Sequence, residues 1–302
     1  MKKYVIITDS CSDLEKSLIE EYDIICVPNT YSFDNKTYNA TVDWQDHSPK
    51  EYYDLLRNGV RIVSSQVSMN EYRRAFEEAI TNGYDVLSIS VSSGLSSSYN
   101  ASLMVKNEMI KKYPDSKIIC IDTLIASLGL GMLVIRASEL RKDGKTIEEV
   151  AKWIEDNKFT VHQEGSVDKL IYLKRAGRVS ATAAFFGGIL NIKPLIISDI
   201  RGKNVAVEKV KGRRASLVRV SERVAERIID VPYQRIFIVH ADCIEEAKEF
   251  KDIVVSKLPK EIAEKVDIHI SYIGQTIGAS VGPGMLGIYF YGVEETYDSE
   301  AK

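Results

Sequence analysis

The chain has 302 residues, of which 45% are hydrophobic and 27% are charged, and its formal net charge is −3. A chain of this length buries a large core and is better suited to two domains than to one. The negative balance argues against general affinity for nucleic acid, because phosphate contacts require a surplus of Lys and Arg on one face.

The cysteines and the N-terminus argue against further classes of protein. Cys11, Cys26, Cys120 and Cys243 are far apart and form no Cys-x-x-Cys pair, so neither a zinc site nor a disulfide framework is expected. The first apolar run, Tyr4 to Ile7, is much shorter than a signal-peptide core or a membrane span. We therefore expect a cytoplasmic protein without stable membrane insertion, bound metal or cofactor.

Strand-like and helical patterns alternate along the first half of the chain. The strand-like runs lie at 4–8, 84–91 and 117–122, and the helical patterns lie near 12–22, 68–81, 97–112 and 126–142. This alternation is typical of βαβ units, which build parallel sheets. The sequence therefore predicts an α/β layer with a parallel sheet and helices on both of its faces.

A glycine and a capping box indicate a boundary in the middle of the chain. Gly144 ends one helix, and Thr146 and Glu149 begin another that covers 146–158. We expect a first domain over residues 1–160 and a second over residues 161–302.

The second domain is predicted to be α/β with a mixed sheet. The runs at 195–200 and 204–208 flank Arg201-Gly202-Lys203 and predict an antiparallel hairpin. A strand at 235–239, a helix near 243–257 and a strand near 266–272 are expected to follow.

Three clusters of hydroxyl side chains follow β-like stretches in the first domain. They run from Thr8 to Asp13, from Ser64 to Ser68 and from Ser92 to Ser98. Ligands of open parallel sheets bind outside the carboxyl ends of the strands, so these loops are expected to converge on one crevice. A carboxylate or phosphate near Ser96 would meet hydroxyl groups and the first amides of a helix together.

Each cluster also has a structural interpretation. Ser96 or Ser97 is alternatively the N-cap of the helix that follows. Ser68 and Glu71 match a capping box, which leaves Ser64 and Ser65 for a ligand.

The serine loop does not match the motif of a serine hydrolase. A nucleophile elbow needs Gly-x-Ser-x-Gly, and Ser98 stands where the second glycine belongs. No obvious base accompanies the loop, so binding is favoured over catalysis. Asp9 and His240 follow or end strands and are candidates for proton transfer, with helix capping and a buried structural imidazole as the alternatives.

Two further segments predict close contact with a ligand or a partner. Glycine stands at 274, 278, 282, 284 and 287, so a ligand head group or a packed neighbour can approach the backbone there. Lys174, Arg175 and Arg178 surround Gly177, and arginine suits phosphate or carboxylate, with a solvated charged turn as the alternative. The flank 193–227 is locally basic and would attract an acidic partner.

Seven motifs resemble the DegV family in order and spacing, over nearly the whole chain. They lie at 8–14, 64–68, 92–99, 122–123, 173–178, 192–194 and 282–284. The resemblance implies a two-domain α/β protein that buries one long-chain fatty acid and performs no chemistry itself. In many bacteria such a protein delivers the fatty acid to a fatty acid kinase, which phosphorylates the carboxylate.

The resemblance also implies roles for single residues. Ser64 stands in place of the family's usual threonine and Ser96 matches the family serine, whose hydroxyl groups contact the carboxylate. Ser280 stands where the family has a histidine that is implicated in the phosphoryl step, so this departure bears on kinase coupling more than on lipid binding. The predicted site comprises Ser64, Ser96, Ser97 and Ser280 at the carboxylate, Arg175 and Arg178 facing a phosphate or partner, and the backbone of Gly278, Gly282 and Gly284 near the ligand.

The leading hypothesis is a non-enzymatic protein that holds the carboxylate with hydroxyls and helix N-terminal amides and presents it to a kinase. Its lipid site is expected between the domains and extending into the second. One alternative is an enzyme in which Ser96 or Asp9 acts with His240 on an acyl or phosphoryl group. Another is a lipid-sensing regulator that contacts a protein through the flank 193–227.

Overall fold

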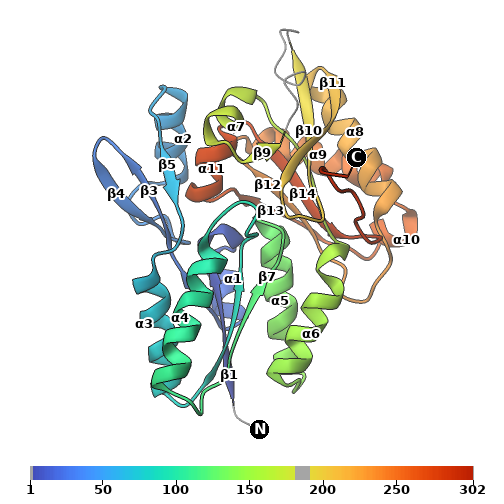
Figure 1. The fold of residues 1–302 in the computed structure, drawn as a ribbon. Coiled ribbons are helices and arrows are strands. Elements are labelled where there is room, and N and C mark those ends of the chain that lie inside the picture. Colours follow the sequence, from blue (N-terminus) through green and yellow to red (C-terminus); the bar gives the residue numbers. More distant parts are fainter. Residues whose placement is uncertain (1–2, 181–190, 302) are drawn as a thin grey trace.

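Two large sheets and one small sheet organise the chain (Figure 1). The computed structural model describes residues 3–180 and 191–301. The strands are β1 (Tyr4–Asp9), β2 (Ile24–Val27), β3 (Asn29–Phe33), β4 (Lys36–Ala40), β5 (Val63–Ser65), β6 (Asp85–Ser90), β7 (Ile118–Asp122), β8 (Val161–Ser166), β9 (Val179–Ser180), β10 (Ile192–Ser198), β11 (Asn204–Lys211), β12 (Ile236–His240), β13 (Ile268–Tyr272) and β14 (Leu286–Tyr291). The helices are η1 (Ser10–Ser12), α1 (Lys16–Glu21), α2 (Pro49–Arg57), α3 (Met69–Thr81), α4 (Ser98–Lys112), α5 (Leu128–Lys142), α6 (Ile147–Asn157), η2 (Lys158–Thr160), α7 (Leu170–Ala176), α8 (Arg213–Arg227), α9 (Ile244–Lys257), α10 (Lys260–Ala263) and α11 (Gln275–Val281).

The first large sheet is parallel, as predicted, with strand order β2-β1-β6-β7. Successive side chains of a strand point to opposite faces of a sheet. Ile6 of β1 joins an apolar cluster with Leu133 of α5, whereas Ile7 joins a cluster with Phe76 of α3 and Val105 of α4. Helices therefore cover both faces of the sheet, which confirms the predicted parallel layer.

The second large sheet is mixed, with strand order β13-β12-β14-β8-β10-β11-β9. β12 pairs parallel with β13 and antiparallel with β14. β10 and β11 pair antiparallel, which confirms the predicted hairpin. Ile238 of β12 packs with Leu217 of α8 and Phe250 of α9 on one face. β8 is the first strand of this sheet along the chain, and the division into domains 1–160 and 161–302 stays a prediction.

Helix α5 lies between the two large sheets. Eleven of its residues are buried, so it lacks the polar face of a surface helix. One apolar cluster continues from Leu87 of the first sheet through Leu130 to Val239 of the second. The helix therefore joins the sheets through a common core.

Neither α5 nor any other helix within residues 3–180 and 191–301 is long and apolar enough to cross a membrane.

The region between β2 and α3 differs from the predicted pattern. It contains a small antiparallel sheet of order β4-β3-β5 and helix α2, whose first turn carries a capping box of Ser48 and Glu51. The small sheet was not predicted, because short strands give too few residues for a clear periodicity. Helix α2 was also missed, although Ser48, Pro49 and Glu51 are a helix-start signal in the sequence. The predicted helix at 12–22 is also shorter, since Asp13 takes a left-handed φ of 50° and separates η1 from α1.

A buried carboxyl group connects the starts of α5 and α11. Oδ2 of Asp13 accepts a hydrogen bond from Oγ of Ser127 at 2.6 Å, and Oδ1 accepts one from the amide of Gly274 at 3.0 Å. Burial raises the pKa of Asp13 to about 7, against the lowering effect of these two hydrogen bonds. Because Ser127 precedes α5 and Gly274 precedes α11, this group fixes the two helices relative to each other.

Helix α11 packs closely on its neighbours through glycines. A Cβ at Gly278 would lie 2.6 Å from the Tyr53 hydroxyl, and one at Gly284 would lie 2.9 Å from Cβ of Asp168. Gly282 ends the helix with a left-handed φ of 73°, and a Cβ there would overlap the Tyr172 ring of α7. The close approach that the sequence predicted for these glycines is therefore made by side chains of the same chain.

We expect Asp13→Asn to alter the pH dependence of the unfolding free energy. The carboxyl group has a pKa of about 7 in the folded protein and about 4 in an unfolded chain. Its contribution to stability is complete below pH ~4 and is lost as the pH rises through ~7. The stability of the wild type relative to the variant should therefore fall between these values in urea titrations. A difference that stays constant over this range would contradict the prediction.

We expect Gly282→Ala to lower the unfolding free energy by about 3 kcal/mol. The left-handed backbone costs a residue with a side chain about 1 to 2 kcal/mol, and overlap with Tyr172 adds about 1 to 3 kcal/mol. Gly177→Ala controls for a positive φ without a steric clash, because Gly177 has a φ of 65° and nothing lies within 4 Å of a Cβ placed there. Denaturant titration of both variants measures the difference, and equal losses would show that neither the Tyr172 ring nor the ψ of 171° at Gly282 adds to the cost.

Candidate functional site

Three of the serines predicted at the carboxylate line one cavity, which we call the hydroxyl cavity. Ser64 comes from β5, Ser96 from the turn before α4 and Ser280 from α11. Ser97, the fourth predicted serine, is exposed and does not line the cavity. The other lining residues are Cys11, Asn29, Ser65, Gln66, Val91, Leu95, Ala126, Leu173, Arg178, Asn204, Thr276, Ile277 and Val281.

The start of α4 holds the Ser96 hydroxyl group in place. Oγ of Ser96 accepts a hydrogen bond from the Ser98 amide at 3.2 Å and lies 3.0 Å from Oγ of Ser98. The Ser96 amide donates to the carbonyl oxygen of Ser92 at 3.0 Å, which closes the turn. Ser97 occupies the N-cap position, but its side chain makes no capping hydrogen bond. The Ser96 hydroxyl therefore serves a first amide of the helix and also lines the cavity.

A buried asparagine connects the three segments around the cavity. Asn29 is fully buried, and its Oδ1 accepts a hydrogen bond from Oγ of Ser10 at 3.1 Å. Its Nδ2 donates to Oγ of Ser98 at 3.4 Å and to the carbonyl oxygen of Ser65 at 3.3 Å. Sequence reasoning missed this residue. It follows β2, which ends at the same edge of the sheet as β1, so the strand-end rule applied to β2 would have found it.

An apolar pocket continues inward from the hydroxyl cavity. The two spaces share Ala126, Leu173, Asn204, Ile277 and Val281. The remaining lining of the inner pocket is Ser127, Gln163, Val167, Ile196, Ile273, Met285 and Tyr289. The site therefore has hydroxyl groups at its outer end and mainly apolar side chains at its inner end, between the start of α5, α11 and one face of the second sheet.

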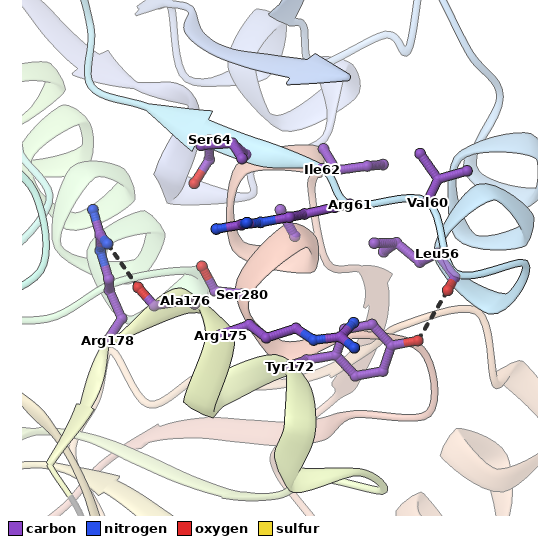
Figure 2. Close-up of a pocket in the computed structure, with 12 residues that line it drawn as sticks. Leu56, Val60, Arg61, Ile62, Ser64, Tyr172, Arg175, Ala176, Arg178 and Ser280 are labelled. Atoms are coloured by element: carbon purple, nitrogen blue, oxygen red, sulfur yellow. Dashed lines mark hydrogen bonds between the residues drawn. The ribbon is translucent and has the colours of Figure 1, made fainter. Parts of the chain in front are cut away.

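A basic vestibule lies on the other side of the hydroxyl cavity (Figure 2). It shares Ser64, Arg178 and Ser280 with that cavity and has a volume of about 170 Å³. The vestibule also contains Arg61 and Arg175, so its lining, within the part of the chain that the structure describes, includes three arginines and no acidic residue. The predicted phosphate or partner residues, Arg175 and Arg178, thus lie beside the predicted carboxylate residues, whereas Arg61 was not predicted.

Hydrogen bonds hold Arg178 and the helix that carries Arg175 in place. Arg178 Nη1 donates a hydrogen bond to the carbonyl oxygen of Ala176 at 2.7 Å. Tyr172, on the same helix as Arg175, donates its hydroxyl proton to the carbonyl oxygen of Leu56 at 3.0 Å. This bond joins α7 to the end of α2 (Figure 2).

The predicted glycines do not line the hydroxyl cavity or the apolar pocket. Gly278 and Gly282 contact Tyr53 and Tyr172, as described above, and Gly284 lines a separate surface depression near Asp168. Direct contact of their backbone with a ligand stays a prediction.

Among the described residues, no side chain that could act as a general base faces Ser96. No His, Asp, Glu or Lys lines the hydroxyl cavity. His240 instead accepts a hydrogen bond at Nδ1 from the Cys243 amide at 3.2 Å, and burial lowers its pKa to about 4. Asp9 accepts hydrogen bonds from the amides of Cys11 and Val91, and burial raises its pKa to about 6. Both side chains serve structural hydrogen bonds.

The basic flank at 193–227 is largely neutralised by acidic neighbours. Arg223 forms a buried ion pair with Glu164 at 2.8 Å, and Arg219 lies 3.0 Å from Glu208. Lys193, Arg213 and Arg227 also form ion pairs, with Asp168, Glu246 and Glu295. Within the described residues, no group of three His, Cys, Asp or Glu side chains is arranged to hold a metal ion. The vestibule arginines, by contrast, have no acidic residue in their lining.

Several known proteins resemble this chain in sequence and in fold. A DegV domain-containing protein of Clostridium perfringens is 40% identical over 292 residues, which cover 97% of this chain and 98% of the relative. The structure of DegV from Bacillus subtilis, described as a fatty acid binding protein, has a TM-score of 0.81 at 27% identity and covers 97% of this chain and 100% of that chain. A DegV family protein from Thermus thermophilus, whose structure is described as one of fatty acid binding, has a TM-score of 0.82 at 26% identity, with the same coverage of 97% and 100%.

The family assignment follows from these matches. The family model described as "Uncharacterised protein, DegV family" matches residues 3–293. The family model and a relative with 40% identity both cover nearly the whole length. The chain therefore belongs to the DegV family.

Proposed function

We propose that this protein binds one long-chain fatty acid, with the carboxylate in the hydroxyl cavity and the acyl chain in the apolar pocket. The observation that carries the proposal is the continuity of the two spaces, which places Ser64, Ser96 and Ser280 at one end and apolar side chains such as Val167 and Met285 at the other. The structures from Bacillus subtilis and Thermus thermophilus, described as fatty acid binding, support it.

The apolar pocket supplies most of the binding free energy. Burial of a methylene contributes about 0.8 kcal/mol, so a chain of ~16 carbons gains on the order of 10 kcal/mol before the costs of association. A hydrogen bond to a charged oxygen adds about 1.5 to 3 kcal/mol. The serines therefore determine which end of the fatty acid faces the vestibule, while the pocket determines how tightly the chain is held.

Binding of a long acyl chain requires lining side chains to move apart. The hydroxyl cavity and the apolar pocket have volumes of about 80 and 30 Å³, whereas pockets for organic ligands usually measure about 300 Å³ or more. Leu173, Ile277 and Val281 line both spaces, so their displacement joins the two into one tunnel.

We further propose that the protein presents the carboxylate to a fatty acid kinase and is not itself an enzyme. Arg175 and Arg178 lie at the vestibule next to Ser280, so a phosphate or an acidic partner there would reach the carboxylate. The hydrolase alternative lacks a base that faces Ser96. The alternative of a lipid-sensing regulator needs a basic surface on the flank 193–227. Ion pairs with acidic side chains neutralise arginines of that flank, which makes it less suited to an acidic partner.

We expect Ser96→Ala to weaken fatty acid binding about tenfold, because it removes one hydrogen bond to the carboxylate. Ser97→Ala is the matched control, since Ser97 is adjacent and exposed and does not line the hydroxyl cavity. Native mass spectrometry of the freshly purified proteins gives the occupancy, and titration with oleate gives the affinity. Equal affinities of the two variants for oleate would show that Ser96 does not bind the carboxylate. A wild type that binds no fatty acid would refute the proposed function.

We expect Arg175→Ala to keep oleate bound but to reduce formation of acyl phosphate at least tenfold in the presence of a bacterial fatty acid kinase and ATP. The guanidinium group lies in the vestibule and outside the hydroxyl cavity, so its loss affects the partner or phosphate more than the acyl chain. Arg74→Ala, an exposed arginine of α3 that pairs with Glu71, controls for the change in net charge. Normal acyl phosphate formation by the Arg175 variant would contradict this role.

A further inference from the structure

Part of the lining of the inner pocket is polar. Gln163 of β8, Asn204 of β11 and Tyr289 of β14 line the pocket together with apolar side chains. Tyr289 and Gln163 are paired in register on neighbouring antiparallel strands, so their side chains lie on the same face of the second sheet. Both are buried, with 3% and 7% of their surface exposed. We call these three residues the polar wall of the pocket.

The hydrogen bonds within the polar wall leave capacity for a ligand. Nε2 of Gln163 donates to Oδ1 of Asn204 at 2.8 Å. The Tyr289 hydroxyl reaches Oε1 of Gln163 only at 3.5 Å, which is long for a hydrogen bond from a hydroxyl group. An amide side chain can donate two hydrogen bonds and accept two, whereas Gln163 makes only these two contacts among the described residues. A polar group inside the pocket can therefore bond to Gln163 and to Tyr289.

A saturated acyl chain leaves this capacity unused. The chain excludes water from the pocket, and a buried polar group that lacks a hydrogen-bond partner costs free energy. Val167, Ile196 and Met285, which line the same pocket, pack against methylene groups without such a cost. An acyl chain that carries an oxygen atom beside the polar wall satisfies both kinds of lining.

The polar wall begins next to the carboxylate site. Asn204 lines both the hydroxyl cavity and the inner pocket, whereas Gln163 and Tyr289 line the inner pocket and not the hydroxyl cavity. With the carboxylate in the hydroxyl cavity, the first carbons of the acyl chain pass Asn204 as they enter the pocket. The oxygen atom that matches the polar wall therefore belongs near the carboxyl end of the chain.

We propose that the polar wall selects fatty acids that carry a hydroxyl group near the carboxyl end, as in a 3-hydroxy fatty acid. This inference rests on the proposed function, because it presupposes a carboxylate in the hydroxyl cavity. The hydroxyl group of the ligand donates to Oε1 of Gln163 and accepts from the hydroxyl group of Tyr289. It thereby replaces the long contact between these two side chains by two hydrogen bonds.

The test compares three ligands of equal chain length on the full-length protein. Palmitate, 3-hydroxypalmitate and 16-hydroxypalmitate compete against a fluorescent fatty acid. The wild type is expected to bind 3-hydroxypalmitate about fivefold more tightly than palmitate, as for the gain of one hydrogen bond between neutral groups. It is expected to bind 16-hydroxypalmitate more weakly than palmitate, because that hydroxyl group is buried far from the polar wall. Equal affinities for the two hydroxylated ligands would overturn the inference.

Substitutions in the polar wall should remove the preference for 3-hydroxypalmitate. Tyr289→Phe removes only a hydroxyl group and should make the affinities for 3-hydroxypalmitate and palmitate equal. Gln163→Met keeps the length of the side chain but removes its amide, so palmitate should become the tighter ligand by about tenfold. Ile196→Val changes an apolar side chain of the same pocket and is the matched control, which should leave the ratio of the two affinities unchanged. A general loss of packing affects both ligands and does not change this ratio.

The remaining outcomes separate the inference from the proposed function. A wild type that binds none of the three ligands would refute the proposed function. A wild type that binds palmitate at least as tightly as 3-hydroxypalmitate would overturn the inference alone. A preference for 3-hydroxypalmitate that persists in Tyr289→Phe and in Gln163→Met would assign the hydroxyl group to another part of the site and would also overturn it. Should Gln163→Met fail to fold, Tyr289→Phe still decides between these outcomes.

Discussion

Burial of α5 between two sheets is the constraint on which the rest of this molecule depends. The helix contributes Leu130 and Leu133 to a core that includes side chains of both sheets, so neither sheet can move without exposing apolar surface. The residues just before the helix, Ala126 and Ser127, then become walls of the inner pocket. Asp13 fixes this point by binding Ser127 and the Gly274 amide. The same packing that stabilises the fold therefore forms the walls of the candidate site.

The candidate site combines an apolar inner pocket with a polar outer end. Apolar side chains from α5, α11 and the second sheet surround the inner pocket, and the three serines lie at its outer end. The serines come from separate elements, so their mutual position depends on tertiary hydrogen bonds. Asn29 provides these by connecting Ser10, Ser65 and Ser98 in one buried network. A buried amide with satisfied donors and acceptors is well suited to this task, because any displacement leaves a polar group unpaired.

Charge is distributed unevenly over this weakly acidic chain. The arginines of the flank at 193–227 are engaged with carboxylates such as Glu164 and Glu208, which lie on strands of the second sheet, so their charge is largely neutralised within the protein. Among the described residues, the vestibule lining contains arginines but no acidic side chain. Positive charge next to the proposed carboxylate site favours anionic ligands and acidic partners. Local sequence counts of Lys and Arg do not distinguish these two situations, since the neutralising carboxylates lie far away in the sequence.

The sequence by itself determined the parallel layer, the hairpin of β10 and β11, the capped start of α6 and the family, because these depend on periodicity and spacing between nearby residues. Only the tertiary structure decided which of the predicted serines meet. It brought Ser280 to Ser64 and Ser96 and turned Ser97 outward, because the outcome depends on how α11 packs against β5 and the start of α4. Asn29 and Arg61 were also missed by sequence reasoning. The strand-end rule applied to β2 would have found Asn29, whereas the place of Arg61 in the vestibule depends on contacts between distant segments, which no local pattern records.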